Sequence, residues 1–127
     1  MKKMILLFSH QLTDEQIKDA KENWNVENFL ALSSELQNYW SNIDPELGSL
    51  KNELLLFCDF IDEVASKGDL ILIQGDFGAC CFMAHYAKSK YMIPVYATTK
   101  RSVKEYTEDG KNIKKSIFEH RKFRRYE

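Results

Sequence analysis

The chain has 127 residues, of which 44% are hydrophobic and 29% are charged, with a net charge of −1. These values are ordinary for a soluble globular protein. The length predicts one domain over residues 1–127, with a hydrophobic core large enough to be stable without disulfides or a structural metal. Its cysteines are odd in number, with two of them adjacent, which excludes a disulfide framework, so we expect buried, reduced thiols at Cys58, Cys80 and Cys81.

The first residues imitate a secretion signal without completing one. Two lysines precede the apolar residues 4–8, but this run of five is shorter than the roughly 7–15 residues that a signal peptide needs. No apolar run approaches the roughly 18 residues of a membrane span. We therefore expect a cytoplasmic protein with no membrane partner.

Charge is distributed unevenly along the chain. Residues 98–127 hold ten Lys/Arg and five Asp/Glu, a net charge of +5, whereas residues 1–97 carry a net charge of −6. A basic C-terminal third is typical of proteins that bind a small polyanion or nucleic acid, and it equally fits a solvated lysine-rich hairpin.

The first quarter of the chain predicts a strand, a helix and a second strand. Residues 4–8 are fully apolar, as in a strand buried on both faces. Thr13 and Gln16 have the spacing of a capping box, which predicts a helix through about Trp24. Residues 28–32 (NFLAL) then predict a short second strand.

The middle of the chain predicts two further helices. Residues 33–43 are polar with embedded aromatics, and we expect a short helical turn over the sheet edge or at a subunit contact. Asp44 and Pro45 have the form of an N-cap and first helical residue. A long amphipathic helix then continues through residues 50–65, and Gly68 suits the position just after its end.

Residues 70–97 predict a central strand, a loop, a helix and another strand. The four apolar residues 70–73 form a run too short for a helix, and a loop with two glycines follows at residues 74–78. Residues 79–90 predict the helix and residues 93–97 the fourth strand. A loop between a strand and a helix directs backbone N–H groups at one point, which favours an anion.

The tail predicts a β-hairpin. Asp109 and Gly110 form a two-residue turn signal between residues 103–107 and 113–123. Residues 98–101 directly follow the fourth strand, at its carboxyl end. The chain as a whole predicts an α/β fold: a parallel sheet in the order 2-1-3-4 with flanking helices and a C-terminal hairpin.

In such a sheet the ligand crevice lies beyond the carboxyl ends of the first and third strands, where the chain connectivity reverses. Three segments should meet there: the loops after the first and third strands and the end of the fourth. The candidate site residues are Ser9, His10, Gln11, Gln74, Gly75, Asp76, Phe77, Gly78, Thr98, Thr99, Lys100 and Arg101.

Several of these residues also have a purely structural interpretation. His10 can be an ordinary exposed histidine, and Asp76 can cap a helix or accept hydrogen bonds from a ribose or an adenine. Phe77 can belong to the core or stack on a base, and Lys100 and Arg101 can be edge-strand charges or bind phosphate.

Other site motifs are missing from the sequence. It has neither a P-loop Lys-Ser/Thr nor a GxGxxG or GxSxG motif, so ATP hydrolysis, NAD chemistry and serine-hydrolase chemistry lose most of their support. The residues show no metal-ligand cluster, and we expect no cofactor. We expect His85 and His120 to be structural.

Five segments together resemble a small Csx family of CRISPR-associated proteins that accompany type III systems. They are residues 4–13 (MILLFSHQLT), 39–43 (YWSNI), 73–78 (IQGDFG), 94–101 (PVYATTKR) and 118–126 (FEHRKFRRY). The resemblance implies a Rossmann-like, CARF-related fold. It also implies recognition of cyclic oligoadenylate, with the four-membered ring favoured, and related proteins are ring nucleases that cut this messenger.

The implied reaction needs no metal: a ribose 2′-hydroxyl attacks the adjacent phosphorus and leaves a 2′,3′-cyclic phosphate. On this basis His10 is the expected acid/base or phosphate donor, and Lys100 and Arg101 are the expected electrostatic stabilisers. The backbone of residues 75–78 would hold phosphate. Ribose and base would be positioned by Gln74, Asp76, Thr98 and Thr99, with Ser9, Gln11 and Phe77 also binding the ligand.

A ring of four identical nucleotides has two-fold symmetry and suits a homodimer, for which Tyr39, Trp40 and the hairpin are candidate contacts. Two alternatives stay open. One is a binding protein that sequesters the messenger without cutting it, and the other is a single-stranded RNA binder acting through the basic hairpin. We expect no stable DNA binding.

Overall fold

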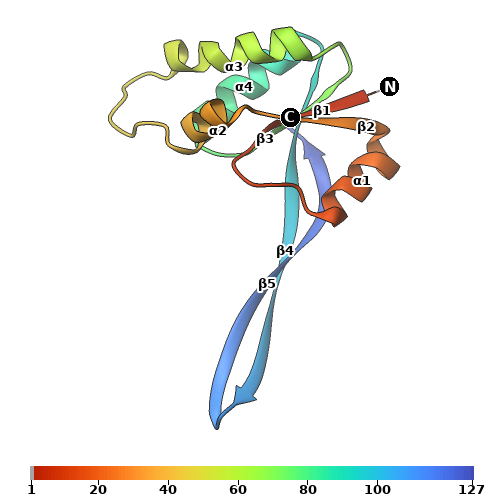
Figure 1. Cartoon of the computed structure of the whole chain (residues 1–127), viewed down its shortest axis with the longest axis vertical. Coiled ribbons are helices and arrows are strands. Elements are labelled where there is room, and N and C mark those ends of the chain that lie inside the picture. Colours follow the sequence, from red (N-terminus) through yellow and green to blue (C-terminus); the bar gives the residue numbers. More distant parts are fainter. Residues whose placement is uncertain (1) are drawn as a thin grey trace.

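Five strands and four helices make up the part of the chain that the computed structural model describes, residues 2–127. In chain order they are β1 (Lys2–Leu7), α1 (Asp14–Trp24), β2 (Val26–Ala31), α2 (Ser34–Ser41), α3 (Lys51–Val64), β3 (Leu70–Ile73), α4 (Phe77–Ser89), β4 (Ile93–Glu108) and β5 (Lys111–Arg125) (Figure 1).

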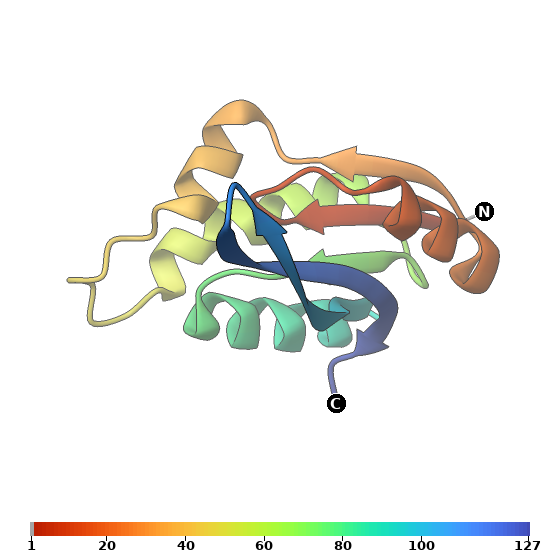
Figure 2. The ribbon, with the colours of Figure 1, turned by 90° about the horizontal axis from the view of Figure 1, so that it is seen from below.

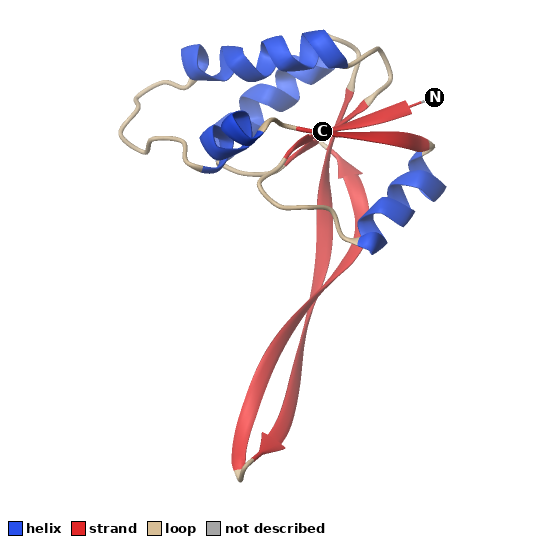
Figure 3. Ribbon diagram, viewed as in Figure 1, coloured by secondary structure: helices blue, strands red, loops and turns tan. Residues whose placement is uncertain are grey.

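The strands form one mixed, mostly parallel sheet in the order β2-β1-β3-β4-β5. The first four strands in this order are parallel to one another, and β5 is antiparallel to β4 (Figure 3). The predicted α/β class and strand order are therefore confirmed. The order follows from right-handed crossovers, which place consecutive helices on opposite faces when the connection reverses direction.

Helices cover both faces of the sheet. Helices α2, α3 and α4 lie together on one face, and α1 lies on the other (Figure 1). Alternate residues of β1 enter two different cores: Ile5 and Leu7 pack towards α3 and α4, and Met4 and Leu6 pack towards α1. This double burial explains why the central strands are apolar without alternation. Within residues 2–127 no helix combines the length and the apolar character that crossing a bilayer requires.

The capping box at the start of α1 is confirmed. The Gln16 backbone N–H donates to Thr13 Oγ1 at 3.2 Å, and the Thr13 N–H donates to Gln16 Oε1 at 2.9 Å. These two bonds satisfy two backbone groups that a helix start otherwise leaves without partners. The helix consequently begins at Asp14 and runs to Trp24, as predicted.

The predicted start of the third helix is wrong. Helix α3 begins at Lys51, and Asp44 instead closes a local turn in which its carboxylate accepts the Glu46 N–H at 2.9 Å. The expectation for Gly68 is also wrong, because α3 ends at Val64 and Gly68, with a φ of +86°, lies in the separate turn before β3. The amphipathic face itself is confirmed, with Leu54, Phe57, Cys58 and Ile61 buried.

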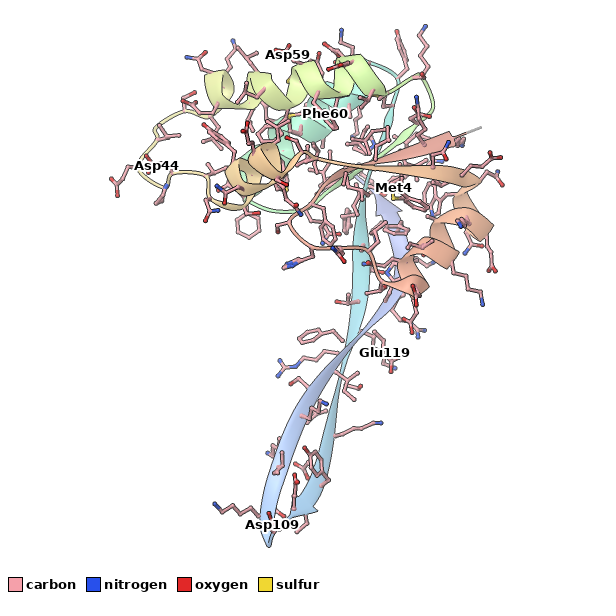
Figure 4. The ribbon with its side chains drawn as sticks, in the orientation of Figure 1. Met4, Asp44, Asp59, Phe60, Asp109 and Glu119 are labelled. Carbon is pink, nitrogen blue, oxygen red and sulfur yellow. The ribbon has the colours of Figure 1, made fainter. Side chains whose placement is uncertain are left out.

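Strand β4 continues without a break through residues 98–101, beyond residue 97 where the predicted fourth strand ends. The correction has a long-range cause: β5 pairs with β4 from Val95 to Glu108, so every residue of the segment has a strand partner. Asp109 and Gly110 form the predicted two-residue turn with φ values of 53° and 76°. The hairpin extends far from the body, with Asp109 at its tip and Glu119 between tip and body (Figure 4).

The base of the hairpin is attached to α1. His120 Nε2 lies 2.7 Å from Asp19 Oδ2, and the two side chains are 5% and 12% exposed. The His120 ring also packs against Phe123 at 4.8 Å between centroids. These contacts give His120 the structural position that was expected of it.

Two expectations need correction: Trp40 as a subunit contact and Cys81 as a buried thiol. Trp40 is only 2% exposed and packs edge-on against Phe57 at 5.0 Å, so it belongs to the core and not to a subunit contact. Cys58 and Cys80 are buried as expected, but Cys81 is exposed. Cys81 lies on the side of α4 that turns away from the buried face of that helix.

We expect Cys81 to be alkylated well before Cys58 when the folded protein meets iodoacetamide at pH 8. Burial, together with the carboxylates of Asp62 and Asp59, raises the pKa of the Cys58 thiol to about 11, so the reactive thiolate is scarce. Mass spectrometry of peptides after timed quenching measures the order. The Cys58 thiol ionises at a lower pH in the unfolded chain than in the folded protein. Cys58 therefore lowers the free energy of unfolding as the pH rises from about 9 to about 11. Equal labelling rates of the two thiols would contradict this account.

Candidate functional site

The loops that follow β1 and β3 leave the same edge of the sheet. Leu7 pairs with Ile73 at the ends of the two strands, and the Gln74 N–H donates to the Leu7 carbonyl at 3.0 Å. In Figure 2 the arrowheads of β1 and β3 point to one side, where α2 and the first turn of α4 lie. The structure therefore brings residues 9–11 and residues 74–78 to one edge, as the strand order predicts.

Helix α2 holds both loops in place. The Trp40 indole N–H donates to the Gln74 carbonyl at 2.8 Å, and the Gln37 amide donates to the Phe8 carbonyl at 3.5 Å. Since Trp40 is buried, its hydrogen bond connects the glycine turn to the close-packed core under α2 and α3. The edge is thus preformed.

Gln74 joins three segments. Its backbone binds β1, its carbonyl accepts from Trp40, and its side-chain Oε1 accepts the Ala97 N–H at 2.8 Å. The last bond extends the contact between β3 and β4 past Val95, the last β4 residue that pairs with β3. Gln74 was expected to bind ligand. In this structure its carbonyl oxygens are engaged by protein, and the side-chain NH₂ is the group that can still donate.

Asp76 caps a helix, which is the structural interpretation of this residue. Its Oδ2 accepts the Ala79 N–H at 3.0 Å, so Asp76 is the N-cap of α4. The same carboxylate would repel a phosphate placed directly on this helix start, because both groups are negative. An anion at this edge must therefore bind beside the helix start and not on its axis.

Replacing Asp76 with alanine should lower the free energy of unfolding by about 1 kcal/mol, because the Ala79 N–H loses its acceptor. Asp76→Asn keeps an oxygen acceptor and should lose less. Urea unfolding followed by circular dichroism gives both values. A stability equal to the parent's in Asp76→Ala would show that the cap contributes nothing.

The core interpretation of Phe77 is wrong. Its side chain is 94% exposed, more than any other large apolar residue among those described. Phe77 is the first residue of α4, and the buried face of that helix consists of Ala79, Cys80, Met83, Ala84 and Ala87. Phe77 lies outside that face, and its stacking on a ligand stays a prediction.

His10 lies exposed just past β1, with its ring edge-on to Phe8 at 5.5 Å between centroids. It lines a hollow of about 320 Å³ together with Gln11, Leu12 and Gln37. None of residues 74–78, the glycine turn, lines that hollow. Within one chain, His10 and the glycine turn therefore share an edge of the sheet but not a pocket.

The segment 98–101 departs furthest from the predicted site. Thr98 Oγ1 donates to the Lys122 carbonyl at 2.9 Å and accepts the Lys122 N–H at 3.2 Å. Arg101 donates to Ser116 Oγ at 3.0 Å. Thr99 pairs with His120 in the hairpin, and Lys100 is exposed. Because neighbouring residues of a strand point to opposite faces, Lys100 and Arg101 cannot face the same anion from one chain.

A larger pocket of about 510 Å³ lies between α4 and the end of β5. Its walls are formed by one side of α4, by two residues of the glycine turn, and by the ends of the chain segments beside them: Gln74, Gly75, Tyr96, Ala97, Tyr126 and Glu127. The site residues that sequence reasoning missed are His85, Lys88, Tyr96 and Tyr126. Two signals could have found them: the three- and four-residue spacing of Cys81, His85 and Lys88 on a helix, and the two tyrosines inside the segments that carry the resemblance.

Tyr126 closes the pocket from the C-terminal side. Its hydroxyl donates to the Ile73 carbonyl at 2.6 Å, its N–H donates to the Pro94 carbonyl at 3.0 Å, and its ring lies edge-on to Tyr96 at 4.9 Å. Burial raises the pKa of Tyr126 above that of an ordinary tyrosine. The hydroxyl is consequently neutral at physiological pH and acts as a hydrogen-bond donor, not as a base.

Within residues 2–127 no three side chains of the metal-ligating types His, Cys, Asp and Glu are grouped to hold an ion. Fold and site together define an α/β protein whose mostly parallel sheet carries polar loops and an aromatic pocket at its carboxyl edge.

Residues 2–124 match the family model described as the uncharacterized protein MJ1673 family, and the chain belongs to this family. Uncharacterized protein MJ1673 of Methanocaldococcus jannaschii is 48% identical to it over 126 residues, which cover 99% of this chain and 98% of that protein. No solved structure matches the chain.

Proposed function

We propose that this protein is a ring nuclease of type III CRISPR immunity, which binds cyclic oligoadenylate and cleaves it without a metal. The observation that carries the proposal is the meeting of two loops at one edge: Leu7 pairs with Ile73, and the Gln74 N–H binds the Leu7 carbonyl. This contact puts an imidazole and a glycine turn at the place where open α/β sheets bind nucleotides. The four-membered ring is the proposed substrate.

The reaction is an in-line transfer within the RNA backbone. A ribose 2′-oxygen attacks the adjacent phosphorus as it loses its proton, the bond to the 5′-oxygen breaks, and that oxygen gains a proton. The product end is a 2′,3′-cyclic phosphate. His10 is the proposed acid or base, and the N–H groups of the turn at residues 75–78 would stabilise charge on phosphorus. Alignment of the attacking oxygen would supply much of the remaining acceleration.

A homodimer explains how separate hollows serve one ring. His10 and the glycine turn open at the same edge but line different hollows. If two copies meet with their axis near this edge, two imidazoles and two glycine turns surround one two-fold symmetric ligand.

Incubating the protein in EDTA with a molar excess of cyclic tetra-adenylate tests the proposal. Chromatography should show linear products with a 2′,3′-cyclic phosphate end and more than one turnover per dimer. An intact ring in a tight complex would instead identify a protein that sequesters the messenger. Absence of both binding and cleavage would overturn the proposed function.

The hairpin favours a second candidate, a single-stranded RNA-binding protein. Phe118 and Tyr106 are 66% and 45% exposed on a segment rich in lysine and arginine, a combination that suits stacking and phosphate contacts. This candidate predicts affinity for linear oligoadenylate that falls steeply with salt and survives replacement of His10. Binding titrations with cyclic and with linear oligoadenylate, each at two salt concentrations, separate the two candidates.

A further inference from the structure

One side of α4 carries a stripe of residues that leaves a hollow. Phe77, Cys81, His85 and Lys88 recur at spacings of four, four and three, so they lie along one side of the helix. The middle of this stripe is small, with Cys81 beside Ala84, whereas its ends are an exposed aromatic ring and two groups that can carry positive charge. The short side chains in the middle create the space.

The opposite wall of this hollow is aromatic. Tyr96 and Tyr126 pack edge-on at 4.9 Å, and the hydrogen bond from Tyr126 to Ile73 fixes their orientation. Arg124 lies over the Tyr96 ring at 5.5 Å and donates to its hydroxyl at 3.1 Å. The pocket is therefore preformed, and its volume of about 510 Å³ lies within the range of roughly 300–1,000 Å³ that is typical of small-molecule sites.

We propose that this pocket binds the base of a purine nucleotide, with the base between the tyrosines and Cys81 and the phosphate at Lys88 and His85. A pocket with aromatic and apolar walls and a cation at one end matches a ring system that carries a phosphate. Phe77 at the mouth adds a second aromatic surface, and Glu127 offers a carboxylate that can accept from an exocyclic amine. A two-ring base offers these walls more apolar surface than a pyrimidine does, which favours a purine.

The nucleotide has two possible sources: a free adenine nucleotide, or one unit of a cyclic oligoadenylate. Only the second source rests on the proposed function. A base bound in this pocket would anchor the ring on the α4 side of the edge, while the residues after β1 lie on the other side. The pocket then acts as the recognition half of the site and contributes no reacting group.

Cys81→Phe tests the pocket because the new ring fills it from an exposed helix position. Leu55→Phe is the matched control, since Leu55 is 49% exposed on α3 and does not line the pocket. Calorimetric titrations use adenosine, 5′-AMP, 5′-UMP and cyclic tetra-adenylate, and thermal melting checks that both variants fold. Lys88→Gln, tested with adenosine and 5′-AMP, locates the phosphate.

We expect 5′-AMP to bind the parent protein more tightly than 5′-UMP, and Cys81→Phe to weaken 5′-AMP by about tenfold or more, which corresponds to about 1.4 kcal/mol. Leu55→Phe should change nothing, and Lys88→Gln should weaken 5′-AMP but not adenosine. If the parent binds none of the four, or if folded Cys81→Phe binds them all as the parent does, the pocket proposal is overturned. If 5′-AMP binding depends on Cys81 while the ring is neither bound nor cut, the pocket stands and the ring-nuclease proposal fails.

Discussion

His10→Ala is expected to slow cleavage of cyclic tetra-adenylate by about 10²–10⁴-fold while leaving the Kd for the ring nearly unchanged. The imidazole is exposed and packs edge-on with the Phe8 ring, so its removal opens no cavity in the core. Single-turnover assays give the rate of the chemical step, and filter binding in EDTA at low temperature gives the Kd.

His10→Gln is the matched variant for this experiment, because glutamine can donate a hydrogen bond to phosphate but cannot transfer a proton near neutral pH. If His10 is the acid or base, both variants lose activity and one limb of the pH–rate profile disappears. If His10 only holds a phosphate, glutamine restores most of the rate. A His10→Ala protein that cleaves at the parent's rate would remove His10 from the mechanism.

Local sequence signals predicted the parts of the fold that depend on neighbouring residues. The capping box at Thr13 and the Asp109-Gly110 turn each involve contacts within three residues, and both were confirmed. The meeting of the two loops was also predictable, because parallel strands in the order 2-1-3-4 put the ends of β1 and β3 side by side. That inference needs only the handedness of crossovers.

Three of the errors concern contacts between distant parts of the chain. Residues 98–101 became a strand because β5 lies beside them, and nothing in their own composition announces that partner. Tyr126 joined the pocket by binding Ile73, which lies 53 residues earlier. Trp40 entered the core through a hydrogen bond to Gln74, 34 residues later. Periodicity reports which face of an element is apolar, but it does not say which distant element covers that face.

Gly75→Ala should reduce both stability and cleavage, because this position is the closest approach between the glycine turn and the core. A Cβ built at Gly75 would lie 2.8 Å from Trp40 Nε1 and 3.2 Å from Trp40 Cε2, and the φ of +158° is one that side chains rarely adopt. Trp40 cannot withdraw easily, since its ring packs on Phe57 and its N–H binds the Gln74 carbonyl. We expect a loss of about 1–3 kcal/mol in the free energy of unfolding.

Gly48→Ala is the matched control, because a Cβ at Gly48 meets nothing within 4 Å, and it should leave both properties unchanged. Urea unfolding measures the stability. The rate of cyclic oligoadenylate cleavage, assayed below the unfolding transition, shows whether the turn is displaced in the folded variant. Trp40→Phe in the Gly75→Ala background removes the clashing indole nitrogen, so the two substitutions together should cost less than the sum of their separate effects. Additive costs would mean that the strain comes from the backbone at Gly75 and not from the indole. A Gly75→Ala protein with the parent's stability and activity would show that the turn moves freely, and a mobile turn could not hold the preformed edge on which the proposed chemistry depends.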